Sequence, residues 1–176
     1  YPWDSGNCLI SLDETPTTIL QNPGGTDSTY TVQLFVTSAD GCTDITSLDI
    51  VVHHQPDSDF NMSQDEGCHP APGTLFNNST GATSYLWDYG DGSQSDTVAL
   101  EHDHEFTSVS ASPVTYNVTL TAITDFGCTN QSSLPYTVFP LITSGFDASD
   151  DGCSPLTVLF NNESLGASNG FEWAFG

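Results

Sequence analysis

Residues 87–92 (WDYGDG) place two carboxylates, two glycines and two aromatic rings within six positions. Asp88 and Asp91 could therefore act as a calcium pair or as a general acid and base. A calcium loop of the EF-hand type needs a third carboxylate position and a distal bidentate Glu, which this stretch lacks. A turn explains the same residues better, because glycine accepts positive φ, aspartate bonds turn amides and Trp87 would fill a core. We interpret Trp87, Asp88 and Asp91 as a structural turn.

Residues 101–106 (EHDHEF) are the best local candidate for a transition-metal site. His102 and His104 lie two positions apart, so on a strand they would share a face and could chelate a divalent ion. We favour a structural interpretation, in which His104 packs against its neighbours or forms hydrogen bonds and does not bind a metal. The pair His53-His54 is a weaker metal candidate. Nucleophilic chemistry is not predicted, because no G-x-S-x-G elbow is present.

The charge composition restricts the partners of the chain. Its 176 residues include 23 Asp and Glu but no Lys or Arg, which gives a formal net charge of −23. Each carboxylate must therefore be solvated, bonded to backbone amides or bound to a cation. Such a chain repels nucleic acid and anionic membranes, and it has no apolar run near the roughly 18 residues of a membrane helix. We expect no nucleic-acid partner and no membrane insertion.

The five cysteines lack the CxxC spacing of a zinc cluster. Together with the acidity and the many Ser and Thr residues, they indicate disulfide bonds in an oxidising compartment outside the cell. The odd count leaves at least one cysteine without a partner in this chain. The cysteines are Cys8, Cys42, Cys68, Cys128 and Cys153.

The sequence repeats itself with a period of about 85 residues. The stretch that begins at Phe60 recurs from Phe146, and the stretch that begins at Ser28 recurs from Val114. The matched positions are Trp3, Trp87 and Trp173, then Cys42 with Cys128, Cys68 with Cys153, and residues 76–78 (FNN) with residues 160–162 (FNN).

The repeat predicts three segments. Residues 1–55 are the C-terminal part of one unit, residues 56–139 are a complete unit, and residues 140–176 are the N-terminal part of a further unit. Pro56 and Pro140 stand at equivalent joints after apolar strands, so we expect the units to pack end to end. We name these parts the first segment, the central unit and the third segment.

The central unit reads as a series of short strands. Tyr116, Val118 and Leu120 alternate with polar residues, a pattern typical of a half-buried antiparallel strand. Further short runs are separated by Gly, Asn, Ser or Pro, and none has a sustained helical period. About seven strands in roughly 85 residues indicate an all-β fold of tandem immunoglobulin-like β-sandwiches.

The central unit resembles the polycystic kidney disease (PKD) domain family, in the cysteine-containing form found in tandem in large secreted proteins of the Bacteroidota. The resemblance rests on residues 67–97 (GCHPAPGTLFNNSTGATSYLWDYGDGSQSDT), on HEF at residues 104–106 and on residues 114–129 (VTYNVTLTAITDFGCT). It implies a sandwich without catalytic machinery that serves as a spacer, an adhesion module or a carbohydrate-associated accessory. In the first segment, Ser5 and Cys8 depart from the family's turn.

Disulfide pairing follows from the places of the cysteines in the repeat. Cys68 precedes the first core strands and Cys128 begins the last strand, so we expect these two to bridge one sandwich. Cys42 and Cys153 then need partners outside the chain or in a neighbouring subunit, where they could bond to each other. Cys8 could pair with Cys42 or stay free.

Carboxylates cluster near the start of the central unit and of the third segment. In some members of the resembled family calcium binds near an interdomain joint, so calcium is the candidate cofactor. The alternative is a solvated acidic surface. The candidate ligands are Asp57, Asp59, Asp150 and Asp151.

Four residues are candidate glycosylation sites. Ser28 and Thr97 lie in triplets that resemble the O-glycosylation signal of the Bacteroidota, and Asn78 and Asn162 lie in N-glycosylation triplets. Turn and strand-face roles are the simpler interpretation.

These features predict a structural or adhesive segment of an extracellular or cell-surface repetitive filament, with no enzymatic activity. Its incomplete outer segments would be completed by a longer chain or by a neighbouring subunit. The expected partners are copies of itself or adjacent repeats, and glycans. The alternative is a carbohydrate-binding or spacer module of a secreted multidomain hydrolase.

Overall fold

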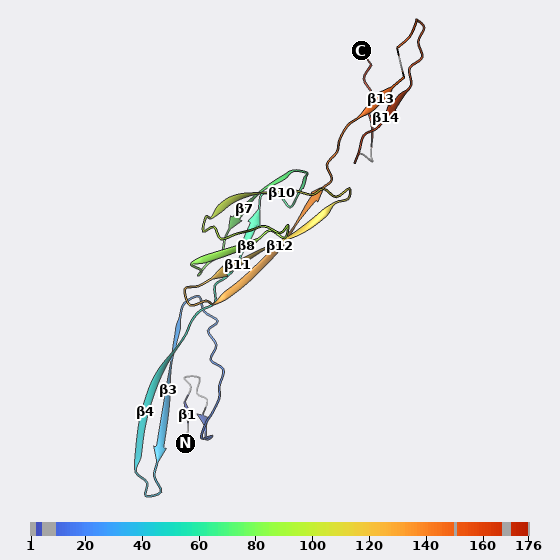
Figure 1. The fold of residues 1–176 in the computed structure, drawn as a ribbon. Coiled ribbons are helices and arrows are strands. Elements are labelled where there is room, and N and C mark those ends of the chain that lie inside the picture. The colour runs from blue at the N-terminus through green and yellow to red at the C-terminus, as the bar shows by residue number, and fades with distance from the viewer. Residues whose placement is uncertain (1–2, 5–9, 150, 167–169, 176) are drawn as a thin grey trace.

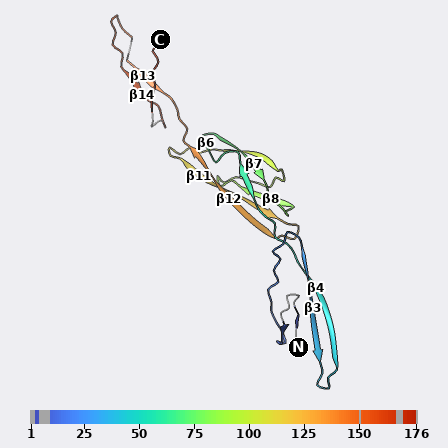
Figure 2. The same cartoon turned by 180° about the vertical axis from the view of Figure 1, so that it is seen from behind.

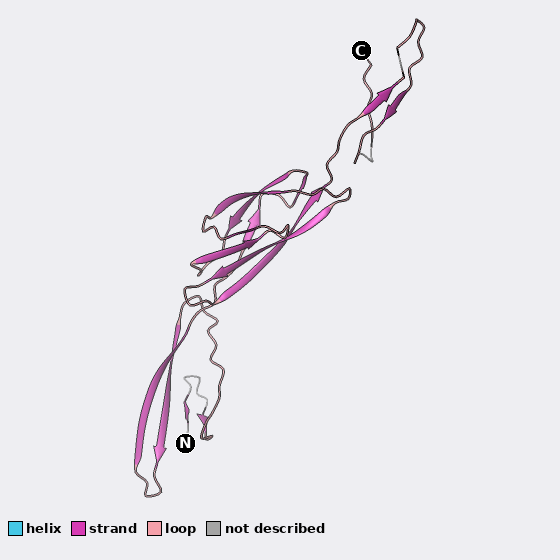
Figure 3. Cartoon of the chain, viewed as in Figure 1, coloured by secondary structure: helices cyan, strands magenta, loops and turns pink. Residues whose placement is uncertain are grey.

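The computed structural model describes residues 3–4, 10–149, 151–166 and 170–175, which form strands and turns without a helix among them. Figure 1, and the view from behind in Figure 2, show three bodies in a row, with the central unit between the two outer segments. Strands build each of the three bodies (Figure 3). The predicted all-β fold is confirmed.

The central unit is a β-sandwich of two facing sheets. Neighbouring strands pair antiparallel, except that β6 and β12 pair parallel. The three-stranded sheet has the order β10 (Glu101–Phe106), β7 (Ala71–Asn77) and β5 (Phe60–Met62). The five-stranded sheet has the order β6 (Glu66–Cys68), β12 (Thr129–Phe139), β11 (Val114–Ile123), β8 (Ser84–Asp88) and β9 (Gln94–Ser95).

The core lies between the two sheets. Val118, Leu120 and Ala122 of β11 are fully buried, and the residues between them are only partly covered. Trp87 of β8 and Tyr136 of β12 are fully buried beside them. Because side chains alternate between the faces of a strand, Val118, Leu120 and Ala122 all face the opposite sheet.

The first segment contains one sheet, whose strands have the order β2-β1-β3-β4. The short strands β1 (Trp3–Asp4) and β2 (Ile10–Ser11) lie beside the long hairpin of β3 (Ser28–Thr37) and β4 (Thr43–Val52). Among the described residues of this segment, no second sheet faces the first.

The hairpin of the first segment repeats the geometry of the central unit. Tyr30 of β3 lies opposite Ile50 of β4, as Tyr116 of β11 lies opposite Tyr136 of β12. The hydroxyl groups of Tyr30 and Tyr116 each donate to the carbonyl oxygen nine residues earlier, at 2.6 Å in both cases. The pairing of β1 with β3 also matches that of β8 with β11.

The third segment contains the two-stranded sheet of β13 (Phe146–Ala148) and β14 (Phe160–Asn162), which correspond to β5 and β7. The rings of Phe146 and Trp173 make an edge contact with centroids 5.4 Å apart. Phe60 and Trp87 make the same contact at 5.1 Å in the central unit. The strands β13 and β14 therefore repeat a part of the sandwich that has no counterpart among the strands of the first segment.

The structure corrects one detail of the repeat, the match between the two FNN triplets. The side-chain oxygen of Asn162 accepts a hydrogen bond from the amide two residues later, and in the central unit Asn77 makes this bond. Counting back from these residues makes Phe160 the counterpart of the buried Leu75, and not of Phe76. The identical letters are misleading because hydrogen-bond register, and not residue type, decides which side chain faces the core.

Candidate functional site

The WDYGDG turn follows β8, and its carboxylates bond within the turn. Asp88 accepts a hydrogen bond from the amide of Gly90 at 2.9 Å, and Asp91 accepts one from the amide of Ser93 at 2.9 Å. Gly90 and Gly92 have φ values of 76° and 96°, a region that favours glycine. Asp88 and Asp91 thus have the role that a structural turn requires.

Two histidines of β10, His102 and His104, form hydrogen bonds with residues of this turn. His104 Nε2 lies 2.7 Å from Asp91 Oδ2, and the ring of His104 stacks on Tyr89 at 3.7 Å. The Tyr89 hydroxyl lies 2.9 Å from His102 Nε2, and burial raises the pKa of Tyr89. Burial also raises the pKa of Asp91, but hydrogen bonds from Ser93 and His104 outweigh it and leave that pKa below its ordinary value.

The half-buried ring of His102 packs against the core. It contacts Trp87 edge to face with centroids 4.9 Å apart, and burial, followed by repulsion from His104, lowers its pKa. Within the described ranges, Nδ1 of His102 and Nε1 of Trp87 are buried without a hydrogen-bond partner. No group of three His, Cys, Asp or Glu in those ranges could hold a metal ion. The described residues therefore give the EHDHEF metal interpretation no support.

The carboxylates predicted to bind calcium do not gather in the described part of the chain. Asp57, Asp59 and Asp151 are exposed. Asp150 lies outside the described residues. Among the described residues, no group of three His, Cys, Asp or Glu side chains could hold a metal ion. Calcium binding at these residues stays a prediction.

A cluster around Asp27 holds the joint between the first segment and the central unit. Its carboxylate oxygens lie 2.8 Å from Nδ1 of His53 and 2.8 Å from Nδ1 of His54. His54 Nε2 lies 3.1 Å from the carbonyl oxygen of Gly81, and the ring of His53 stacks on Phe126 at 3.4 Å. The bonds with His54 and then His53 lower the pKa of Asp27, and the bonds with Asp27 and then the Gly81 carbonyl raise the pKa of His54.

Sequence reasoning named the two histidines of this cluster but missed Asp27 and Phe126. A signal for Asp27 exists in the hairpin register. Ser28 lies opposite Val52, so the residues just beyond them, Asp27 and His53, must also meet. Through His53 and His54, the cluster makes a contact between the first segment and the central unit.

The predicted Cys68–Cys128 bridge is wrong, because the fold separates the two thiols. Cys68 ends β6 and lies opposite Phe139, at the end of β12. Cys128 directly precedes the start of β12. The eleven residue steps from Cys128 to Phe139 span about 36 Å of extended strand, whereas a disulfide needs Cα atoms within about 7 Å. Both thiols are free, as are those of Cys42 and Cys153.

The first segment exposes side chains whose counterparts form the core of the central unit. Ile50 is 38% exposed, whereas its counterpart Tyr136 is fully buried. Leu34 is half-buried, whereas its counterpart Leu120 has no exposed surface. This face of the hairpin carries apolar residues at the positions that form the core of the central unit. Among the described residues of the first segment, no second sheet packs against it.

The third segment also exposes side chains whose counterparts are buried in the central core. Phe146 is 64% exposed, against 4% for its counterpart Phe60. Trp173 is 39% exposed, against 0% for Trp87. In the central unit, Phe60 and Trp87 belong to the buried cluster between the two sheets. An open groove of about 450 Å³ is lined by the aromatic rings of Phe146, Phe160, Phe171, Trp173 and Phe175.

The candidate glycosylation sites lie in different surroundings. Ser28 begins β3 and is half-buried, and the hydroxyl of Thr97 accepts a hydrogen bond from the amide two residues later at 3.2 Å. Asn78 and Asn162 are exposed. Glycosylation at these sites stays a prediction. Cys8 and its predicted pairing lie outside the described residues.

The fold of the central unit defines an immunoglobulin-like β-sandwich module. Residues 63–139, within the central unit, match the model of the PKD domain family. PKD domains are generally non-catalytic structural modules and occur in extracellular and secreted proteins. No helix in the described ranges is long and apolar enough to cross a membrane.

Comparison with solved structures finds other sandwich modules. The PKD1 domain of Vibrio anguillarum Epp is 26% identical with a TM-score of 0.38, over 48% of this chain and 94% of that one. The PKD1 domain of the Vibrio cholerae metalloprotease PrtV is 24% identical with a TM-score of 0.39, over 48% and 98%. A structure of promiscuous carbohydrate-binding modules from the β-sandwich superfamily is 18% identical with a TM-score of 0.44, over 55% and 46%. No curated protein matches the chain.

Proposed function

We propose that this chain is a structural segment of an extracellular filament or surface protein built from PKD-like units. In this assembly, residues 140–176 of one copy and residues 1–55 of the next form one composite sandwich. The observation that carries the proposal is the pair of exposed apolar faces on the outer segments, whose counterparts lie together in the central core.

The two outer segments supply complementary strands. The first segment has the counterparts of β8, β9, β11 and β12, and the third segment has the counterparts of β5 and β7. Residues 15–20 correspond to β10, which pairs with β7 in the central unit. In a composite sandwich these residues would add a strand beside β14, so main-chain hydrogen bonds would join the copies as well.

Side-chain burial gives the association its driving force. Each large apolar side chain that becomes buried contributes about 1.5–3 kcal/mol. Electrostatic repulsion opposes association, because every copy carries a formal charge of −23. Salt screens that repulsion, so the composite sandwich should form more readily at high ionic strength.

Light scattering of the reduced chain tests the proposal. A single copy has a mass of 18.8 kDa, and we expect a larger mass that rises with protein and salt concentration. Phe160→Asp places a charge on the groove and should abolish the assembly. Asn161→Asp is the matched control, because Asn161 is exposed and lies on the other face of β14. A constant monomer mass for the unmodified chain, or an equal loss in both variants, would contradict the proposal.

A further inference from the structure

We propose that the cysteines of this protein bond across the joints between consecutive units, and not within a unit. Cys68 of one copy bonds to Cys42 of the next, and Cys153 of the first copy bonds to Cys128 of the second. The inference rests on the proposed completion of one copy by another, and it replaces the intra-unit pairing that the fold excludes.

Cys68 lies at the joint that follows its unit. Its strand β6 runs parallel to the end of β12, which leads into the third segment at Pro140. Cys68 lines an open depression there, together with Ile142 and Gly166 of the third segment. The thiol is exposed, so it can meet a partner that arrives with the next unit.

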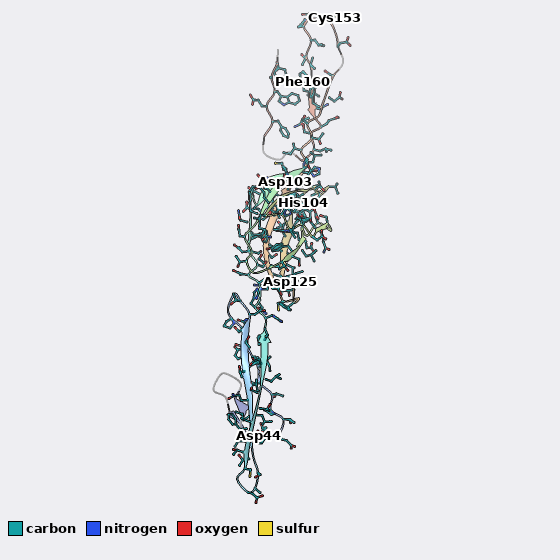
Figure 4. The ribbon with its side chains drawn as sticks, turned by 90° about the vertical axis from the view of Figure 1, so that its left-hand side faces the viewer. Asp44, Asp103, His104, Asp125, Cys153 and Phe160 are labelled. Carbon is teal, nitrogen blue, oxygen red and sulfur yellow. The ribbon has the colours of Figure 1, made fainter. Side chains whose placement is uncertain are left out.

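Cys128 lies at the joint that precedes its unit. It closes the turn between β11 and β12, where the amide of Thr124 donates to the carbonyl oxygen of Cys128 at 3.0 Å. Figure 4 shows Asp125 of this turn at the end of the central unit that meets the first segment. Phe126 of the same turn stacks on His53 across that joint.

Cys42 and Cys153 occupy the same two positions in the outer segments. Cys42 closes the turn between β3 and β4, where the amide of Ser38 donates to the carbonyl oxygen of Cys42 at 2.8 Å. Figure 4 shows the neighbouring Asp44 toward the far end of the first segment, and Cys153 at the opposite extreme of the molecule. Among the described residues, the central unit thus has one cysteine at each end, and the two outer segments together repeat that arrangement.

A composite sandwich brings these ends together in pairs. At the joint before it, Cys68 of the first copy faces Cys42 of the second copy. At the joint after it, Cys153 of the first copy faces Cys128 of the second copy. All four thiols find partners, and both bonds link the same two copies.

His53 shows how close the second pair comes. In the central unit Cys68 lies opposite Phe139, and the strand register makes His53 the counterpart of Phe139. Cys153 of one copy would therefore lie opposite His53 of the next. The ring of His53 already stacks at 3.4 Å on the turn that ends at Cys128. In the composite sandwich, Cys153 of one copy and Cys128 of the next would thus both lie beside His53.

The bonds form by thiol–disulfide exchange with a small-molecule or protein disulfide outside the cell. Two protein thiols lose two electrons and two protons and form one S–S bond, and the disulfide oxidant is reduced to two thiols. A thiolate makes the first attack. Cys42, Cys68 and Cys153 are exposed and Cys128 is partly exposed, so the oxidant can reach them.

Disulfide mapping after oxidation with oxidised glutathione tests the inference. A mixture of unlabelled and ¹⁵N-labelled chain is oxidised, its remaining thiols are blocked, and it is cut with chymotrypsin, because the chain has no Lys or Arg for trypsin. We expect peptides that join Cys68 to Cys42 and Cys153 to Cys128, with mixed isotopes in about half of them. Peptides that join Cys68 to Cys128 or Cys42 to Cys153, or four unbonded thiols, would overturn the inference.

A single substitution separates the two pairings. Cys42→Ser should leave Cys68 free for alkylation and keep the bond between Cys153 and Cys128. Release of Cys153 by this variant would contradict the cross-joint pairing. Cys8→Ser serves as the control background, in which both bonds should persist. Light scattering under reducing conditions separates the claims: reduced oligomers with other bonds overturn only this inference, and a reduced monomer overturns the proposed function as well.

Discussion

Replacement of Gly90 by alanine tests whether backbone packing fixes the central turn. Gly90 has a φ of 76°, and an added Cβ would lie 2.8 Å from both the amide nitrogen and the carbonyl oxygen of Asn117 in β11. Because these are backbone atoms, no side-chain rotation relieves the contact. Gly92 is the matched control, since its φ of 96° is also positive but its Cβ would meet open space.

The expected losses of unfolding free energy differ between the two glycines. Gly92→Ala adds the left-handed conformation alone, which costs about 1–2 kcal/mol. Gly90→Ala adds an overpacked contact of about 1–3 kcal/mol, for a total of about 2–5 kcal/mol. Small domains have unfolding free energies of roughly 5–15 kcal/mol, so the Gly90 variant should lose a large part of its stability.

Urea unfolding gives the assay, with Trp87 as the reporter because it is fully buried in the core. Both variants are made in a Trp3→Phe, Trp173→Phe background, so that Trp87 is the only tryptophan and can be excited selectively. The midpoint for Gly90→Ala should fall well below that for Gly92→Ala. Equal midpoints would refute the close approach of the turn to β11.

Two histidines should give opposite pH dependences. Burial lowers the pKa of His102, so the unfolded state binds a proton at this residue more readily than the folded state does. The free energy of unfolding should therefore keep its full His102 contribution above about pH 6.5 and lose it as the pH falls below that value. Urea unfolding of His102→Phe should show a flatter slope between about pH 7 and pH 5, and an unchanged slope would contradict this. The pKa of His54 is raised by its bond with Asp27 and then by its bond with the Gly81 carbonyl across the joint, so these bonds are fully formed below about pH 6.5 and are lost as the pH rises through the folded pKa. Small-angle scattering should then show a broader range of maximum dimensions at high pH, and His54→Gln should show that breadth at every pH; a pH-independent range in the unmodified chain would contradict the role of His54.

Much of the fold follows from local patterns in the sequence. The alternation around Val118 and Leu120 places both in the core, because strand side chains alternate between faces. The recurrence of Trp3 and Trp87 predicts equivalent positions, and both lie opposite leucines of the long strands. These predictions succeed because they depend on one strand or on one hairpin.

The parts that failed depend on which strands become neighbours. The order of Cys68 and Cys128 along the chain does not show that β6 joins the far end of β12, so a bridge between them looked reasonable. The FNN match failed for a related reason, because only hydrogen bonds across strands reveal that Phe160 takes the place of Leu75. Asp27 was missed because it meets His53 only after the hairpin has closed.

Electron micrographs of the reduced, unmodified chain in high salt test the central claim most directly. If the outer segments complete each other, the chain should form filaments in which each copy adds two sandwich lengths, one for the central unit and one for the composite. Single particles with one compact body, at every concentration and salt level, would contradict it.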